Sequence, residues 1–262
     1  MQPFTLLFVC AALTAAVPAS AMGAPLIPSY IAAAVADPDR PQSEKARDVI
    51  RQPGVVLAFA GVKPGDRVVD LMPGFGYFTR ILSKIVGPKG KVYALLIFGQ
   101  DVFVDMQNSA RSLAGAPDYL NVTVLEQPVT AIALPERVDM VWLSQNYHDL
   151  HRDFLGSPDM ARFNRSILQA LKPGGIFLVL DYVAADGTAF SKADSLHRVE
   201  PAALKMEVTA AGFEFIGQSA VLRNPLDDHS LSIFDPKISG KIDQFVYKFR
   251  KPAYPATTTP GR

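Results

Sequence analysis

All four histidines of this chain lie in segments that follow predicted strands, and acidic residues stand beside them. An imidazole with an ordinary pKa of about 6.5 can accept and return a proton at neutral pH, so each is a candidate general base. The same side chains have the chemistry of a divalent-metal site. A His-x-x-His spacing on a loop does not specify one, however, and we predict no metal. The histidines and their nearest acids are His148 with Asp149, His151, His197, and His229 with Asp227 and Asp228.

The elements that must position these residues alternate along the chain. Short β-branched runs take turns with helical stretches, which is typical of a parallel sheet with helices on both faces. Ligands of such sheets bind at the carboxyl ends of the strands, where the histidines fall. We expect strands at 67–71, 91–96, 121–125, 138–144 and 175–182, helices at about 77–86, 100–114, 158–171 and 200–211, and a closing strand pair at 213–222 and 242–250.

The first predicted strand ends in an acid, Asp70, and a turn with two glycines, Gly74 and Gly76, before a helix. Glycine has no Cβ and lets a ligand approach the backbone, while amides at the start of the helix point toward that ligand. The turn lacks the third glycine of the nicotinamide motif, because Thr79 stands in its place. Any doubly wound fold with a tight strand–helix connection could carry such a turn.

A second motif, Leu171-Lys172-Pro173-Gly174-Gly175, stands directly before the fifth predicted strand. Together with the glycine turn, it resembles the class I S-adenosylmethionine-dependent methyltransferase superfamily across roughly residues 53–250. Three stretches resemble, more narrowly, a group of predicted bacterial methyltransferases with export signals. They are residues 72–80, Tyr147-His148-Asp149-Leu150 and residues 222–229.

The resemblance implies an α/β, Rossmann-like three-layer sandwich. Its seven-stranded, mostly parallel sheet would have the order 3-2-1-4-5-7-6, with the last strand antiparallel. The cofactor implied is S-adenosyl-L-methionine, lying over strands one and two. Asp70, Gly74 and Gly76 match the motif that lines its methionine part, Glu126 matches the acid that receives the adenine amino group, and Asn146 stands near its methyl group.

Two positions depart from the superfamily pattern. Met72 replaces the first glycine of the turn, and Leu96 stands where an acid usually holds the ribose hydroxyls. Charge-assisted hydrogen bonds of that kind contribute about 1.5–3 kcal/mol each, so their loss weakens cofactor binding.

The loop after the fourth strand faces the transferable methyl in this superfamily. The resemblance therefore makes His148 the candidate base, with Tyr147 and Asp149 as its catalytic neighbours. Alternatively, His148 is a structural histidine bonded to a loop carbonyl, and Asp149 caps the following helix. Arg223 either holds a substrate carboxylate or forms an ion pair with Asp227 or Asp228. The predicted substrate-binding residues are His197, Arg198, Arg223 and His229.

The overall charge restricts the partners. A formal net charge of +1 supplies no general attraction for phosphate backbones, so we set nucleic acid aside and expect a small-molecule acceptor. The leading function is methyl transfer to an unidentified small acceptor. The alternatives are an exported protein of this fold that binds a small molecule without turnover, and a metal-assisted hydrolase that uses the His and Asp loops.

The N-terminus carries an uncharged apolar run over residues 4–17, followed by Ala19-Ser20-Ala21. This pattern predicts a signal peptide over 1–21, and the run is too short for the roughly 20 residues of a membrane span. The mature protein would be periplasmic or secreted and would contain no cysteine, since the only one is Cys10. We expect an N-terminal arm and helix over 22–52 with Ser43 as N-cap, a methyltransferase-like domain over 53–251, and a disordered tail over 252–262.

Removal of residues 1–21 is directly testable. Mature protein recovered after export should begin at Met22, because signal peptidase cleaves after a small-x-small pattern. N-terminal sequencing checks this, and exported protein that begins at Met1 would contradict it.

Overall fold

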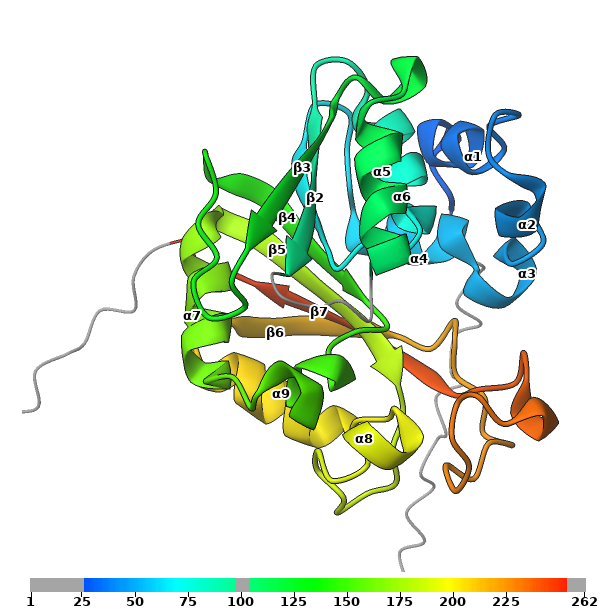
Figure 1. The fold of residues 1–262 in the computed structure, drawn as a ribbon, viewed down its shortest axis with the longest axis vertical. Helices are drawn as coiled ribbons and strands as arrows, with labels where there is room; N and C mark the ends of the chain where they lie inside the picture. The colour runs from blue at the N-terminus through cyan, green and yellow to red at the C-terminus, as the bar shows by residue number, and fades with distance from the viewer. Residues whose placement is uncertain (1–25, 98–103, 254–262) are drawn as a thin grey trace, which may run out of the picture.

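The computed structural model describes residues 26–97 and 104–253. Its centre is a seven-stranded sheet of order β3-β2-β1-β4-β5-β7-β6 (Figure 1). Only β7 runs antiparallel to its neighbours, β5 and β6, and the other pairs are parallel. The predicted order and the antiparallel last strand are therefore confirmed. The strands are β1 (Arg67–Leu71), β2 (Lys91–Ile97), β3 (Val122–Gln127), β4 (Val138–Ser144), β5 (Leu171–Tyr182), β6 (Glu214–Ser219) and β7 (Gln244–Arg250).

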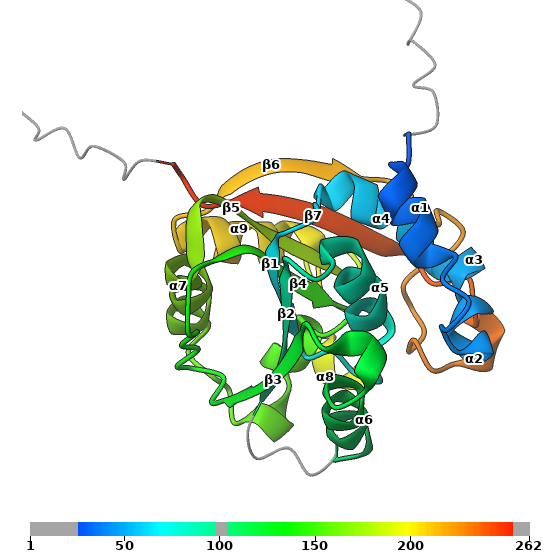
Figure 2. The same ribbon diagram turned by 90° about the horizontal axis from the view of Figure 1, so that it is seen from above.

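Helices cover both faces of the sheet (Figure 2). Successive strand residues point to opposite faces, so each strand supplies two cores. Val68 and Trp142 pack under α1, α4 and α5, whereas Val69 and Val141 pack under α7 and α9. The long helices are α1 (Ser29–Val35), α4 (Pro53–Ala60), α5 (Tyr77–Val86), α6 (Val104–Ala114), α7 (Met160–Ala170) and α9 (Pro201–Ala210). The short ones are α2 (Gln42–Lys45), α3 (Asp48–Arg51) and α8 (Ala193–Leu196), with 3₁₀ turns η2 (Pro117–Tyr119), η3 (His148–His151), η4 (Asp153–Leu155) and η5 (Pro236–Ile238).

The N-terminal segment is more ordered than the sequence suggested. The stretch expected to be an irregular arm contains α1, because Ile31 and Ala34 are buried in the core against α4 and α5. The predicted cap was also wrong: α2 begins at Gln42 after Pro41, and Ser43 lies inside the helix. This segment brings α3 to the carboxyl edge of the sheet.

Two strand boundaries also differ from prediction. β3 continues to Gln127, which places Glu126 inside the strand, and β5 begins at Leu171 because this residue pairs with Val138 of β4. The predicted signal peptide, residues 100–103 of a predicted helix and most of the predicted tail lie outside the described residues. Among the helices that are described, none has the length and apolarity to cross a membrane.

A buried acid joins β1 to α5 beneath the glycine turn. Asp70 is 2% exposed and accepts a hydrogen bond from the Thr79 hydroxyl at 2.6 Å. Burial disfavours the charged carboxylate and raises the pKa of Asp70 to about 7, although Thr79 and the charge of Arg51 oppose the shift. Asp70 therefore anchors the start of α5, and the free-energy cost of burying its carboxyl group depends on pH.

This cost predicts how stability changes with pH. Between about pH 4 and pH 7 an unfolded Asp70 has lost its proton while the folded one keeps it, so the free energy of unfolding falls as pH rises, by up to about 4 kcal/mol. Asp70→Asn should remove this contribution. Urea unfolding at several pH values checks it, with Asp118→Asn, at an exposed position, as control. Identical pH dependence in wild type and Asp70→Asn would contradict the shift.

Candidate active site

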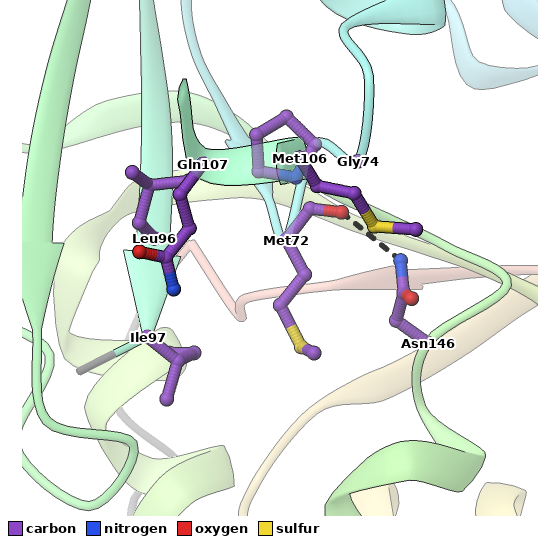
Figure 3. Close-up of a pocket in the computed structure, with 8 residues that line it drawn as sticks. Met72, Gly74, Leu96, Ile97, Met106, Gln107 and Asn146 are labelled. Atoms are coloured by element: carbon purple, nitrogen blue, oxygen red, sulfur yellow. Dashed lines mark hydrogen bonds between the residues drawn. The ribbon is translucent and has the colours of Figure 1, made fainter. Parts of the chain in front are cut away.

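A pocket opens at the carboxyl ends of β1 and β2, where this architecture was expected to bind its cofactor. About 370 Å³ of space there is not filled by protein atoms, and part of it is open to solvent. It brings together four of the residues that the sequence singled out, Met72, Gly74, Leu96 and Asn146 (Figure 3). Its remaining lining residues are Pro73, Ile97, Met106 and Gln107.

The two glycines of the turn serve different purposes. Gly76 has φ +87°, and a Cβ there would lie 2.9 Å from Leu113 of α6, so this glycine allows the helices to pack. Gly74 has φ +58°, and a Cβ there would meet nothing within 4 Å. Gly74 therefore exposes its backbone to the pocket, as the predicted cofactor role requires. Gly76 is needed for helix packing and does not line the pocket.

Met72 adopts a left-handed conformation, which glycine accepts more readily than other residues. Its φ is +55°, a left-handed conformation that costs an ordinary residue about 1–2 kcal/mol. The backbone is held from both sides, because its amide donates to the Leu95 carbonyl at 2.9 Å and its carbonyl accepts from Asn146 Nδ2 at 3.0 Å. In Figure 3 the Met72 side chain extends between Ile97 and Asn146.

Leu96 and Glu126 are neighbours in the register of β2 and β3. Leu96 lines the pocket at the place expected for the ribose acid. Glu126 lies one strand farther out and does not line the pocket. Its carboxylate is paired with Arg111 of α6 at 2.7 Å, so the predicted adenine acid already has a cationic partner.

The loop after β4 connects the pocket to the N-terminal helices. Gln145, at φ +60°, accepts a hydrogen bond from Arg51 of α3 at 2.7 Å and donates one to Gln244 of β7 at 2.7 Å. Arg51 also lies over the Tyr77 ring, 4.6 Å from its centroid. Arg51 was not among the predicted site residues, because the helix expected after Ser43 was not placed beside the loop that follows β4.

His148 is buried two residues beyond Asn146 and faces a carboxylate at each ring nitrogen. Nδ1 lies 2.8 Å from Asp181 of β5, and Nε2 lies 3.4 Å from Asp149. Burial alone would lower the pKa of His148, but the two carboxylates outweigh it and raise that pKa. His148 thus keeps its proton to higher pH than a free histidine. Asp181 was missed, although it is the one charged residue in the apolar run 176–182.

His197, in the segment that follows β5, lies beside His148. It ends α8 at φ +55°, and its ring stands edge-on to that of His148, with the centroids 5.5 Å apart. Burial and the charge of Arg152 lower the pKa of His197. Of the four predicted substrate residues, His197 is the one that the structure places against the candidate base.

Tyr147 turns away from this cluster. It is fully buried, and its hydroxyl donates to Glu207 at 3.1 Å and accepts from Asn164 at 3.0 Å. These contacts fasten the loop to α7 and α9.

The other predicted substrate residues hold the loop between β6 and β7. Arg198 is fully buried and pairs with Asp227 at 2.9 Å. Arg223 binds Asp243 through two nitrogens, at 2.8 and 3.0 Å. This partner is neither of the two acids expected, because the chain returns to the sheet beside Arg223. His229 reaches the same carboxylate at 3.1 Å.

Comparison with known proteins agrees with this geometry. Residues 69–179 match the model of a methyltransferase domain. The chain is 29% identical over 145 residues to the ubiquinone/menaquinone biosynthesis C-methyltransferase UbiE of Pseudomonas paraeruginosa strain DSM 24068 / PA7, covering 52% of this chain and 50% of that protein. It spans about half the length of the curated relatives it matches.

Solved structures share the fold. A SAM-dependent methyltransferase from Aquifex aeolicus superposes with a TM-score of 0.57 at 23% identity, covering 82% of this chain and 96% of that one. The [4+2]-cyclase SpnF superposes with a TM-score of 0.56 at 17% identity, covering 82% and 85%. The matched domain covers the part of the chain from β1 to β5, and the strand order and the pocket beside the glycine turn are those expected from the resemblance to the class I S-adenosylmethionine-dependent methyltransferase superfamily.

Proposed function

We propose that this protein transfers a methyl group from S-adenosylmethionine to a small acceptor. The observation that carries the proposal is the pocket at the carboxyl ends of β1 and β2, lined by Met72 and Gly74 of the turn and by Leu96. Open α/β sheets bind their ligands at this edge, and a left-handed, glycine-containing turn lets a cofactor approach the backbone.

The lining residues suggest how the donor would lie. Its methionine part would follow the turn at Gly74, its ribose would face Leu96, and its adenine would extend toward Glu126 and Arg111. The sulfonium methyl would then point to the loop after β4, where Asn146 lines the pocket and His148 follows two residues later. The acceptor's nucleophilic atom would meet the His148 cluster.

Arg51 is suited to bind the donor's carboxylate. Its guanidinium lies between Tyr77, which begins α5 after the turn, and Gln145, which precedes Asn146. Burial and the charge of Arg47 lower the pKa of Arg51, and within the described ranges it forms no ion pair. A half-buried guanidinium has lost part of its hydration, so an anionic ligand group would compensate for that loss. The methionine carboxylate is the anion that this end of the pocket would receive.

This role predicts a selective loss of affinity. Arg51→Met should weaken binding of S-adenosylhomocysteine by about 10- to 100-fold, as expected for a charged hydrogen bond, while leaving 5′-methylthioadenosine, which lacks the amino-acid part, nearly unchanged. Calorimetric titration of both ligands measures this. Arg47→Met, at an exposed position of the same segment, is the matched control. An equal loss for both ligands would mean that Arg51 only supports the fold.

The acceptor is not identified by the relatives. UbiE is named for C-methylation in ubiquinone and menaquinone biosynthesis, but only about half of each chain aligns. We propose a small-molecule acceptor and, from the apolar run and the Ala19-Ser20-Ala21 site, action outside the cytoplasm.

A second function remains in competition, because the donor is made in the cytoplasm. Leu96 at the ribose position and Met72 at a glycine position favour a protein that binds a small molecule in this pocket without turnover.

Titration with S-adenosylmethionine and S-adenosylhomocysteine decides between these functions. The wild-type chain should bind both, and Leu96→Asp should bind at least about 10-fold tighter, because it restores a charge-assisted bond to the ribose. Leu96→Asn, which has the same shape without the charge, should gain less.

Circular dichroism establishes that each variant is folded. Unchanged or weaker affinity in folded Leu96→Asp would show that Leu96 does not face the ribose. No binding of either ligand by any variant would overturn the methyltransferase proposal and leave the binding protein.

A further inference from the structure

The ends of β4 and β5 gather a second set of side chains beyond the cofactor pocket. His148, Asp149 and His197 each offer one ligand atom, and these atoms all lie within 4.8 Å of one another. We propose that they bind a divalent first-row transition metal ion of the Zn²⁺ type. The sequence analysis predicted no metal, because a His-x-x-His spacing on a loop does not specify one, and the folded excursion after β5 is what brings His197 to His148.

The spacing of the first two donors fits such an ion. Ligand atoms about 2.0–2.1 Å from a tetrahedral Zn²⁺ lie about 3.3–3.4 Å from each other. His148 Nε2 and Asp149 Oδ1 are 3.4 Å apart. This distance is long for a hydrogen bond and suits two donors that share a cation.

Asp181 prepares His148 for this role. Its Oδ1 lies 2.8 Å from His148 Nδ1, and its Oδ2 accepts the His148 backbone amide at 2.8 Å. With the Nδ1 proton directed to Asp181, Nε2 is left as the donor that faces Asp149. Metal-binding histidines commonly have such a carboxylate behind them, which fixes the tautomer and increases the ligand's basicity.

The remaining groups hold the site and leave it accessible. Arg152 fastens Asp149 through Oδ1 at 2.9 Å, so the ion would share this carboxylate with Arg152, while the fully buried Asp181 supplies a second negative charge behind His148. His197 is half-buried and packs edge-on against the exposed Phe234, which leaves a route from solvent. Two histidines and one carboxylate leave coordination positions open, as in catalytic rather than structural sites.

The bound ion would act on the acceptor, a role that rests on the proposed function. An acceptor hydroxyl held at an open position would lose its proton to solvent at a lower pH. The oxygen would then form a bond to the methyl carbon as the carbon–sulfur bond breaks, and the bond's electron pair would leave with S-adenosylhomocysteine. The ion would thus activate the acceptor hydroxyl, and His148 would serve as a ligand instead of as a general base.

Metal titration of the full chain, stripped with a chelator, tests the site. Wild type should bind one Zn²⁺ per chain by calorimetry, and Co²⁺ should give the visible absorption of a low-symmetry site with nitrogen ligands. His197→Ala and Asp149→Asn should weaken binding by more than about 100-fold, and Asp181→Asn by about 10- to 100-fold, as for an outer carboxylate. His151→Gln, on the same 3₁₀ turn but outside the cluster, is the matched control and should bind normally.

Two results would overturn the site. One is the absence of stoichiometric Zn²⁺ binding by folded wild-type protein, and the other is equal binding by wild type and by His197→Ala, whose half-buried position makes it the variant most easily accommodated. Either result would leave an ion pair among His148 and its two acids. S-adenosylhomocysteine titration of the stripped protein is read separately, so failure of the donor pocket and failure of the metal site are distinguished.

Discussion

The hydrogen bond from Asn146 to the Met72 carbonyl ties together the two loops on which the rest of the site depends. The carboxyl ends of β1 and β4 are adjacent in the sheet, so a turn after one and a loop after the other must share the same edge. The Asn146 amide spans both, bonding to Met72 at 3.0 Å and to the Ser144 carbonyl of its own strand at 2.7 Å. The left-handed Met72 is thereby held in a conformation that its side chain disfavours. Asn146 also lines the pocket and orients the segment that leads to His148.

Charge is balanced differently on the two sides of that bond. Toward the N-terminal helices, Arg51 is a desolvated cation whose described contacts are an amide and aromatic rings. Toward β5, His148 meets two carboxylates. One side therefore has a cation without a carboxylate in hydrogen-bond contact, and the other has two carboxylates that share His148 and Arg152. Elsewhere Arg198 and Asp227 form a buried pair within the chain, so we expect ligands at the groups around Arg51 and His148 rather than there.

Hydrophobic patterning made most of the architecture predictable from the sequence. The succession of β-branched runs and helical stretches predicted a parallel sheet that ends in a strand pair, and the glycine turn predicted the place of the pocket, because these features depend on local residues. The strand order itself followed from the resemblance to the methyltransferase superfamily. The helices before β1 were predicted less well from the sequence. Their stability comes from burying a few small apolar side chains such as Ile31 against α4 and α5, a tertiary effect that local propensity does not report.

Side-chain partners could be predicted far less well than backbone position. His197, Arg198, Arg223 and His229 all fall in the loops expected, yet only His197 turns toward the candidate base. The other three form ion pairs within the chain: Arg198 with Asp227, and Arg223 and His229 with Asp243. These acids come close only because the long loop between β6 and β7 folds back. Composition alone treats an arginine in such a loop as available to a ligand. A buried one needs a partner in either case, and here the chain supplies it.

The shared fold does not determine the reaction, which depends on the groups around Arg51 and His148. SpnF, named as a [4+2]-cyclase, has this architecture at a TM-score of 0.56, so the sheet and the pocket edge are compatible with reactions other than methyl transfer. What this chain adds to that fold is Leu96 in the pocket, at the proposed ribose position, a cation at Arg51, and the His148 cluster at the proposed acceptor end. Donor affinity would be governed by the first two and acceptor activation by the third. The three can be altered independently, because they lie on β2, on α3, and on the loops after β4 and β5.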